Sequence, residues 1–177
     1  MRDPQTPNVD AVVIGAGFGG IYMLHKLRNG LGLKVRVYDK AGGVGGTWYW
    51  NKYPGAMSDT EAHIYQYSFD KQMLQDWDWK NRYWNQPDIL AYLQAVVERH
   101  DLAKDIRLNT SIESLVFSDA SNSWIVTTGD GETSCALWAS CRRLTCPTSR
   151  AATPFVARWS TPVIGRRTSR LNASGWA

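Results

Sequence analysis

The sequence has little of what marks several protein classes. It has no apolar run long enough to cross a membrane, and residues 1–4 lack the apolar core of a signal peptide. Its three cysteines have no histidine near them, and their spacing fits neither a usual zinc site nor a disulfide framework. We therefore expect no membrane association, no metal ligands and a cytoplasmic location.

Acidic residues are missing from the end of the chain. The net charge of +4 divides into −3 over residues 1–135 and +7 over residues 136–177, where seven arginines stand without any Asp or Glu. A basic arm of this kind is typical of nucleic-acid binding. Another explanation, given below, leads us to expect no nucleic-acid partner.

The most informative stretch lies near the beginning. Four apolar residues from Ala11 predict a buried strand, and Gly15, Gly17 and Gly20 follow with the spacing G-x-G-x-x-G. A helical apolar pattern begins at Ile21. A tight turn from strand to helix collects backbone N–H groups at the positive end of the helix, where a pyrophosphate binds.

An acidic residue at the right distance strengthens this interpretation. Residues 35–38 predict a second strand, and Asp39 follows it, 24 residues after Gly15. An acid at this place accepts hydrogen bonds from a ribose hydroxyl. The alternative is that Asp39 is an ordinary turn residue at the end of a strand. Because both parts occur together, we favour a dinucleotide site.

A second glycine cluster, residues 41–55, is rich in aromatic residues. Its core is Gly42-Gly-Val-Gly-Gly-Thr-Trp-Tyr-Trp-Asn51, and Tyr53-Pro-Gly55 follows. A surface loop with a few packed aromatics is one interpretation. The other is a loop that folds over a flat ring system such as a flavin.

Together these motifs resemble the N-terminal FAD-binding region of the type I Baeyer–Villiger monooxygenases, in particular the cyclohexanone monooxygenase branch. The run Asp59-Thr-Glu61, then Tyr65 and Tyr67-Ser-Phe69, continue the resemblance, which covers about residues 10–133. It implies an α/β, Rossmann-like FAD/NAD(P)-binding fold, in which a parallel sheet with helices is joined by a β-hairpin.

The resemblance also implies roles for individual residues. The first glycine loop would hold the FAD pyrophosphate, Asp39 the adenosine ribose, and Asp59 would lie near the flavin and the nicotinamide. A helix N-cap or turn is the alternative role for Asp59, and core packing is the alternative for the aromatic residues. The predicted cofactor-binding residues are Gly15, Ala16, Gly17, Phe18, Gly20, Asp39, Lys40, Gly46, Thr47, Trp48, Asp59, Tyr65 and Ile112.

The remaining pattern is simpler. Residues 70–84 predict a covering loop or short helices. Residues 87–102 predict a helix with apolar residues on one face, and Pro87 and Asp88 suit its first turn. Residues 106–108 predict a short strand, and residues 111–117 and 124–128 predict a β-hairpin.

After Thr133 the apolar residues follow neither the helical nor the strand period. The family has a buried strand here that returns to the sheet, and we expect it to be lost in this chain. Codons shifted by one base can encode Ala-Leu-Gly-Val-Leu across Ala136–Ser140; its glycine is forced, because Trp138 ends in G and Ala139 begins with GC. Across Pro154–Arg166 they can encode F-x-G-x-x-x-H-x-x-x-W-P, the family signature. Across Gly175–Ala177 they can encode Val-Gly, where the NADPH loop should begin. We therefore expect a frameshift near Ser134–Ala136 and an early stop; a genuine disordered basic tail is the alternative.

We therefore expect three segments: a flexible N-terminus over residues 1–9, an FAD-binding domain over 10–135, incomplete at its C-terminus, and a frameshifted, disordered tail over 136–177.

The family uses FAD and NADPH to insert one oxygen atom from O₂ next to a ketone carbonyl. Because the NADPH loop is missing from the translated frame, we expect a fragment without turnover and name no catalytic residue. An N-hydroxylating or flavin-containing monooxygenase, or a non-enzymatic FAD-binding module with a basic tail, is the alternative.

Overall fold

The structure, a computed structural model, describes residues 8–78 and 80–141, with the backbone alone for residues 138–141. The strands are β1 (Val9–Ile14), β2 (Val35–Tyr38), β3 (Met57–Glu61), β4 (Tyr83–Asn85), β5 (Ile106–Arg107), β6 (Ile112–Ser118), β7 (Ser123–Thr128) and β8 (Thr133–Cys141). The helices are α1 (Phe18–His25), its π-helical continuation η1 (Lys26–Gly30), α2 (Thr47–Trp50), α3 (Lys71–Asp76), α4 (Gln86–Arg99) and the 3-10 turn η2 (Ala103–Asp105). None of these helices is long and apolar enough to cross a membrane.

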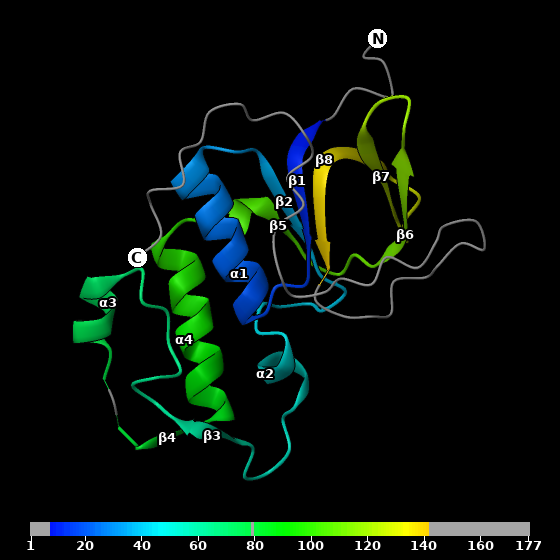
Figure 1. The fold of residues 1–177 in the computed structure, drawn as a ribbon. Coiled ribbons are helices and arrows are strands. Elements are labelled where there is room, and N and C mark those ends of the chain that lie inside the picture. The colour runs from blue at the N-terminus through cyan, green and yellow to red at the C-terminus, as the bar shows by residue number, and fades with distance from the viewer. Residues whose placement is uncertain (1–7, 79, 142–177) are drawn as a thin grey trace.

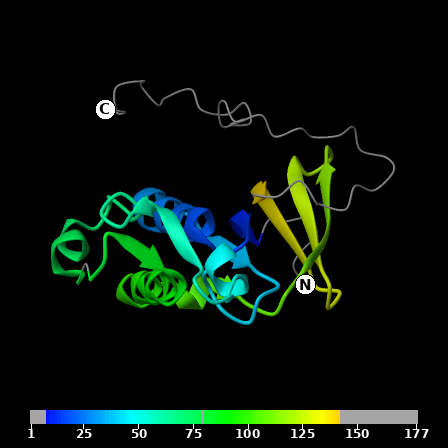
Figure 2. The same ribbon diagram turned by 90° about the horizontal axis from the view of Figure 1, so that it is seen from below.

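Six strands form the main sheet in the order β5-β2-β1-β8-β7-β6. Strands β5, β2, β1 and β8 are parallel, whereas β7 and β6 are antiparallel. The helices α1 and α4 lie together on one side of this sheet, and the antiparallel strands extend away from them (Figures 1 and 2). From β1 the chain continues to β2 and β5 on one side of the strand, and it later places β8 on the other side. Ligands of α/β proteins bind at such a switch point, beyond the carboxyl end of the strand.

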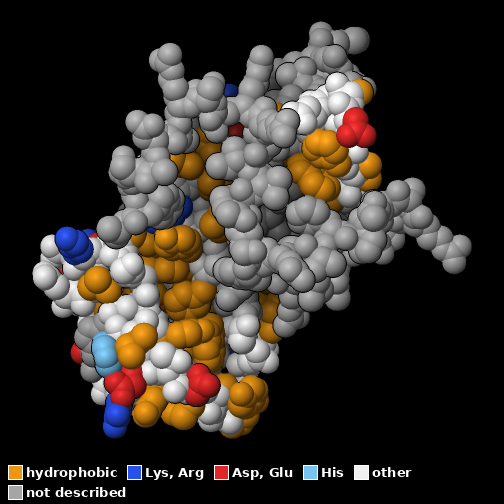
Figure 3. All heavy atoms as spheres, in the orientation of Figure 1, with side chains coloured by type: hydrophobic (Ala, Val, Ile, Leu, Met, Phe, Trp, Pro, Cys, Tyr) orange, Lys and Arg blue, Asp and Glu red, His pale blue; other side chains and the backbone are white. Residues whose placement is uncertain are grey.

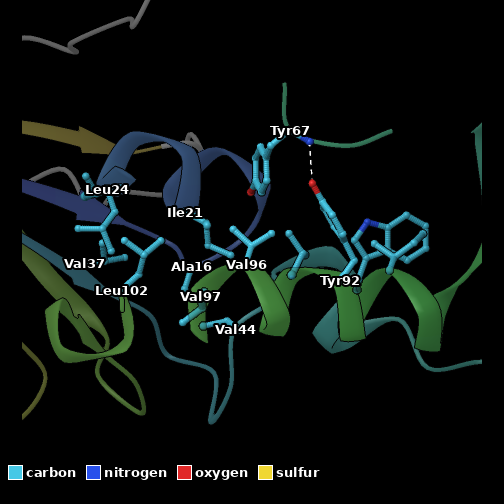
Figure 4. Packing of buried hydrophobic residues seen from close by; sticks show 14 of the residues in the cluster. Ala16, Ile21, Leu24, Val37, Val44, Tyr67, Tyr92, Val96, Val97 and Leu102 are labelled. Carbon is cyan, nitrogen blue, oxygen red and sulfur yellow. Dashed lines mark hydrogen bonds between the residues drawn. The ribbon is translucent and has the colours of Figure 1, made fainter. Parts of the chain in front are cut away.

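The core explains why β1 is almost entirely apolar. Ala11 and Val13 belong to the main cluster between the sheet and the helices, while Val12 belongs to a second cluster on the opposite face. A central parallel strand covered on both faces needs apolar residues at every position. Figure 4 shows the main cluster, with Ile21 and Leu24 from α1 beside Val96, Val97 and Leu102.

The Rossmann-like fold predicted from the sequence is confirmed, with its β-α-β unit and its β-hairpin. Helix α4 begins with Pro87 in its first turn, as predicted, but it ends at Arg99 and not at residue 102. Asp101 has a φ of +50°, which an α-helix does not accommodate. The predicted short helix within residues 70–84 is α3, capped by Asp70, whose carboxylate accepts a hydrogen bond from the Met73 N–H at 2.9 Å.

The expectation that no strand returns to the sheet after Thr133 is wrong. Strand β8 lies between β1 and β7, so β1 is not an exposed edge. Ser134, Cys135 and Ala136 are buried in it. A central strand is held by backbone hydrogen bonds to both of its neighbours. These bonds form whatever the side chains are, so the strand does not need an apolar period. Residues 136–141 of the predicted tail are therefore a strand, and residues 142–177 lie outside the described part.

Candidate cofactor-binding site

Two positions of the turn between β1 and α1 require glycine, for different reasons. Gly15 has a φ of +98°, in the region that favours glycine. A Cβ atom on Gly20 would lie 1.7 Å from the carbonyl oxygen of Gly15. The helix therefore begins directly against the end of the strand, the close packing that the motif predicts for Gly20.

The two glycine loops of the sequence touch each other. A Cβ atom on Gly17 would lie 3.3 Å from the Cα of Gly46, and one on Gly46 would lie 2.8 Å from the Cα of Gly17. The Gly45 N–H also donates a hydrogen bond to the Ala16 carbonyl at 2.8 Å. Any side chain at Gly17 or Gly46 would therefore push the loops apart.

Asp39 joins the same loops from the end of β2. One carboxylate oxygen accepts a hydrogen bond from the Ala16 N–H at 2.6 Å, and the other accepts one from the Ala41 N–H at 2.8 Å. The residue is 8% exposed. Each carboxylate oxygen has two lone pairs, so both retain the capacity to accept a hydrogen bond from a ligand. Asp39 thus serves as a turn residue without losing its capacity to bind a ribose.

These features border one cavity of about 900 Å³, near the upper end of the range for small-molecule and cofactor sites. Most of the predicted residues line it, although they come from separate parts of the chain. They are Gly15, Gly17, Phe18, Gly20, Asp39, Lys40, Gly46, Thr47, Trp48, Tyr65 and Ile112.

Two predicted residues do not line the cavity. Ala16 is fully buried, and Asp59 is exposed on β3. Asp59 belongs to a strand, so the helix N-cap among its alternative roles is wrong. Its predicted place near the flavin and the nicotinamide stays a prediction.

Sequence reasoning missed several cavity residues, among them Asn51, Gln66, Thr110 and Ser111. Thr110 and Ser111 directly precede Ile112, and the Thr110 N–H donates to the Asp39 carbonyl at 2.9 Å. Their position beside a predicted contact is the signal that could have found them.

An aromatic wall closes the cavity on the side of α2. The Trp48 indole N–H donates to the Tyr65 hydroxyl at 3.1 Å, and the Phe18 ring lies 4.7 Å from that of Tyr65. Trp50, at the mouth, is 56% exposed, and the Lys40 ammonium lies 5.8 Å from its ring. Flat apolar rings beside a polar backbone loop suit a ligand with one aromatic and one phosphorylated part.

One polar group beside the cavity has no partner. The side-chain oxygen of Gln66, a residue that lines the cavity, is buried and has no hydrogen-bond partner among the described residues. Its amide nitrogen donates to the His63 carbonyl at 3.0 Å. A buried acceptor without a partner is uncommon in a folded protein.

Comparison with known proteins places this site in a family. Residues 13–78 match the family model of the NAD(P)-binding Rossmann-like domain. The chain is 64% identical over 132 residues to phenazine N-monooxygenase PhzNO1 of Lysobacter antibioticus and 51% identical over 128 residues to cyclohexanone 1,2-monooxygenase of an Acinetobacter species. The crystal structure of cyclohexanone monooxygenase from Rhodococcus sp. Phi1, bound to NADP⁺, superposes with a TM-score of 0.73 at 54% identity.

The chain is similar to the N-terminal part of the Baeyer–Villiger monooxygenases. The matches cover 75%, 72% and 76% of this chain, but 24%, 24% and 25% of those three proteins. The chain thus spans about a quarter of the length of these relatives. A further structural match, OTEMO in complex with FAD and NADP, has a TM-score of 0.70 at 36% identity.

Proposed function

We propose that this chain binds FAD in the cavity between its two glycine loops. The pyrophosphate lies on the backbone of Gly15 and Gly17, and the adenosine ribose lies against Asp39. The flavin lies toward Thr47, Trp48 and Tyr65. The observation that carries the proposal is the joining of both glycine loops by one buried carboxylate at the wall of a single cavity.

Helix and loop geometry support the placement of the phosphates. The N-terminus of α1 begins at Phe18, directly after the glycine turn. Backbone N–H groups at a helix N-terminus are unsatisfied within the helix and favour a bound anion. Lys40 lines the cavity next to Asp39 and supplies a positive charge near the same loop.

For the whole enzyme we propose flavin-dependent oxygenation with FAD and NADPH. Bound FAD supplies the redox chemistry, and the residues described here bind and orient it. Insertion of an oxygen atom next to a ketone carbonyl is the activity that the name cyclohexanone 1,2-monooxygenase indicates for that relative. The same chemistry on a ketone of this kind is our first candidate.

Oxygenation of a ring nitrogen is the second candidate. Phenazine N-monooxygenase PhzNO1 shares 64% of its residues with this chain over the matched region, compared with 51% for the cyclohexanone enzyme. We expect the segment after the matched region to decide between these substrates. The described residues supply an FAD site, so we expect no turnover from this chain alone.

Titration of the purified chain with FAD tests the proposal. We expect one FAD per chain, with quenched flavin fluorescence where the ring lies beside Trp48. ADP should compete with FAD for the ribose and pyrophosphate subsites. A chain that folds but binds neither ligand contradicts the proposal. NADPH oxidation dependent on cyclohexanone or phenazine would contradict the expectation of inactivity.

A further inference from the structure

Two of the three histidines meet at the end of α1 that lies away from the glycine loop. The His25 ring stacks on Phe69 with centroids 4.0 Å apart and planes 13° from parallel. Its edge meets His100, the C-cap residue that follows α4, with centroids 4.8 Å apart. The contact joins the C-terminal ends of α1 and α4 to the segment before α3 (Figure 1).

Asp70 anchors that segment from the other side. Its carboxylate lies 2.7 Å from Nε of Arg99 and 3.0 Å from Nε2 of His100, and it caps α3 at Met73. An imidazolium at His100 would therefore form an ion pair with Asp70. Among the described residues, His25 forms no ion pair. Its Nδ1, like Nε2 of His100, is buried without a hydrogen bond in that part of the chain.

We propose that His25 and His100 form a proton-sensitive contact that holds the segment Phe69–Asp76 against α1 and α4. Asp70 holds His100 from one side, and the edge of His25 meets it from the other. A proton on His25 places a positive charge against His100, Lys26 and Arg28, and so loosens the contact that holds the segment.

The charges around His25 oppose its protonation. The cationic groups that act on it are His100 once protonated, Lys26 and Arg28, and Asp70 is the acid that opposes them. Arg28 is itself paired with Asp105 at 2.7 Å, and Arg99 with Asp70. The two rings are half-buried, so solvent screens the repulsion between positive charges there less than at an exposed site.

The direction of titration agrees with this geometry. Burial first, and then the positive neighbours, lower the pKa of His25 below its ordinary value of 6.5. The unfolded chain thus binds this proton more readily than the folded chain. The stabilisation is complete above pH 6.5 and is lost as the pH falls below it.

The contact continues toward the cavity. Phe69 stacks on Tyr67 at 4.9 Å, and the Tyr67 hydroxyl donates to the Phe18 carbonyl at 2.7 Å. Phe18 lines the cavity. Release of Phe69 therefore removes support from the cavity wall, so acid should also weaken FAD binding; this consequence rests on the proposed function.

Thermal unfolding of the full chain between about pH 5 and pH 8 tests the contact. The wild-type midpoint should fall by about 2–4 °C per pH unit below 6.5. His25→Phe keeps a flat ring on Phe69 and cannot take a proton, so its midpoint should fall less. His63→Phe is the matched control, since the His63 side chain is 65% exposed, and it should keep the wild-type slope. An unchanged slope in His25→Phe overturns the proposal.

NMR titration of the wild-type histidines decides the question if His25→Phe does not fold. The imidazole of His25 should titrate with a pKa below its ordinary value of 6.5 in the folded chain. A His25 pKa at or above that value overturns the proposal. FAD release is measured in parallel: acid should release it from wild type before His25→Phe. Failure to bind FAD at neutral pH would reject the proposed function and leave the unfolding test intact.

Discussion

Asp39 has two tasks that one substitution can separate. Its carboxylate accepts hydrogen bonds from the Ala16 and Ala41 N–H groups, and it lines the cavity. We expect Asp39→Asn to weaken FAD binding roughly 10- to 150-fold, because hydrogen bonds to a charged group contribute about 1.5–3 kcal/mol. Titration of flavin fluorescence measures the change.

Asp59→Asn is the matched control for this prediction. Asp59 is exposed on β3 and does not line the cavity. Its substitution should leave the FAD dissociation constant of this chain unchanged. Equal losses in both variants would show that charge, and not the position of Asp39, governs binding.

A pair of glycines tests the loop geometry. We expect Gly20→Ala to lower the free energy of unfolding by about 3 kcal/mol or more, because the new Cβ atom would lie 1.7 Å from the Gly15 carbonyl oxygen. Gly30→Ala in η1 meets nothing within 4 Å and should stabilise the chain by about 0.4–1 kcal/mol. Urea unfolding compares them, and equal stability of both variants would contradict the packing.

At the scale of elements, α4 supports the glycine loop through two tyrosines. The hydroxyl of Tyr92, a residue 1% exposed, accepts a hydrogen bond from the Tyr67 N–H at 2.8 Å (Figure 4). We expect Tyr92→Phe to cost about 1–3 kcal/mol of unfolding free energy, because a buried N–H loses this acceptor. Tyr83→Phe, at a residue 37% exposed, should cost far less.

Alkaline unfolding provides a second measurement on Tyr92. Burial raises the pKa of its hydroxyl to about 12, above the ordinary value of 10. The folded chain therefore retains a proton that the unfolded chain loses, and stability should fall as the pH rises from 10 toward 12. Tyr92→Phe should reduce this slope. An identical alkaline slope in both proteins would contradict the assignment.

Helices and strands whose apolar residues recur at a regular spacing were predictable from the sequence. The residues of β2 and the apolar face of α4 carry their own signal, and the structure contains both. Helix α2 and the paired strands β3 and β4 are too short to show a hydrophobic period. The glycine loop before α2 is held by contacts with residues distant in the sequence, Gly46 with Gly17 and Gly45 with Leu90. Strand β8 shows the same limit, since its partners β1 and β7 determine its conformation.

The site was more predictable than the elements around it. Glycine spacing and Asp39 report local backbone geometry, which a sequence pattern encodes directly. Gln66 and Thr110 reach the cavity only through tertiary contacts, so no local pattern reveals them. Asp59 shows the converse, because a motif position alone did not bring its side chain to the cavity.

At the scale of the whole molecule, apolar side chains remain exposed near the cavity. Figure 3 shows hydrophobic side chains gathered over the helical part of one face. Trp50 and Ile64, which both line the cavity, are 56% and 63% exposed, and Tyr53 and Met57 are exposed to a similar degree. Exposed apolar area at a cavity is typical of a binding or interaction surface. In the relatives, the three quarters of the chain outside the matched region could pack against this surface.

The abrupt change in composition also concerns the whole chain, and its gene can explain it. Sequence similarity to the phenazine and cyclohexanone enzymes extends over 132 and 128 of the 177 residues, and no acid follows Glu132. We expect the nucleotide sequence to show a one-base shift near Ser134–Ala136, after which the displaced codons restore the family's signature. Restoring the frame should yield a chain with NADPH-dependent turnover, whereas the present frame should not. Codons across residues 136–177 that do not encode the signature in any shifted frame would contradict this explanation, and the residues would then be a basic segment in their own right.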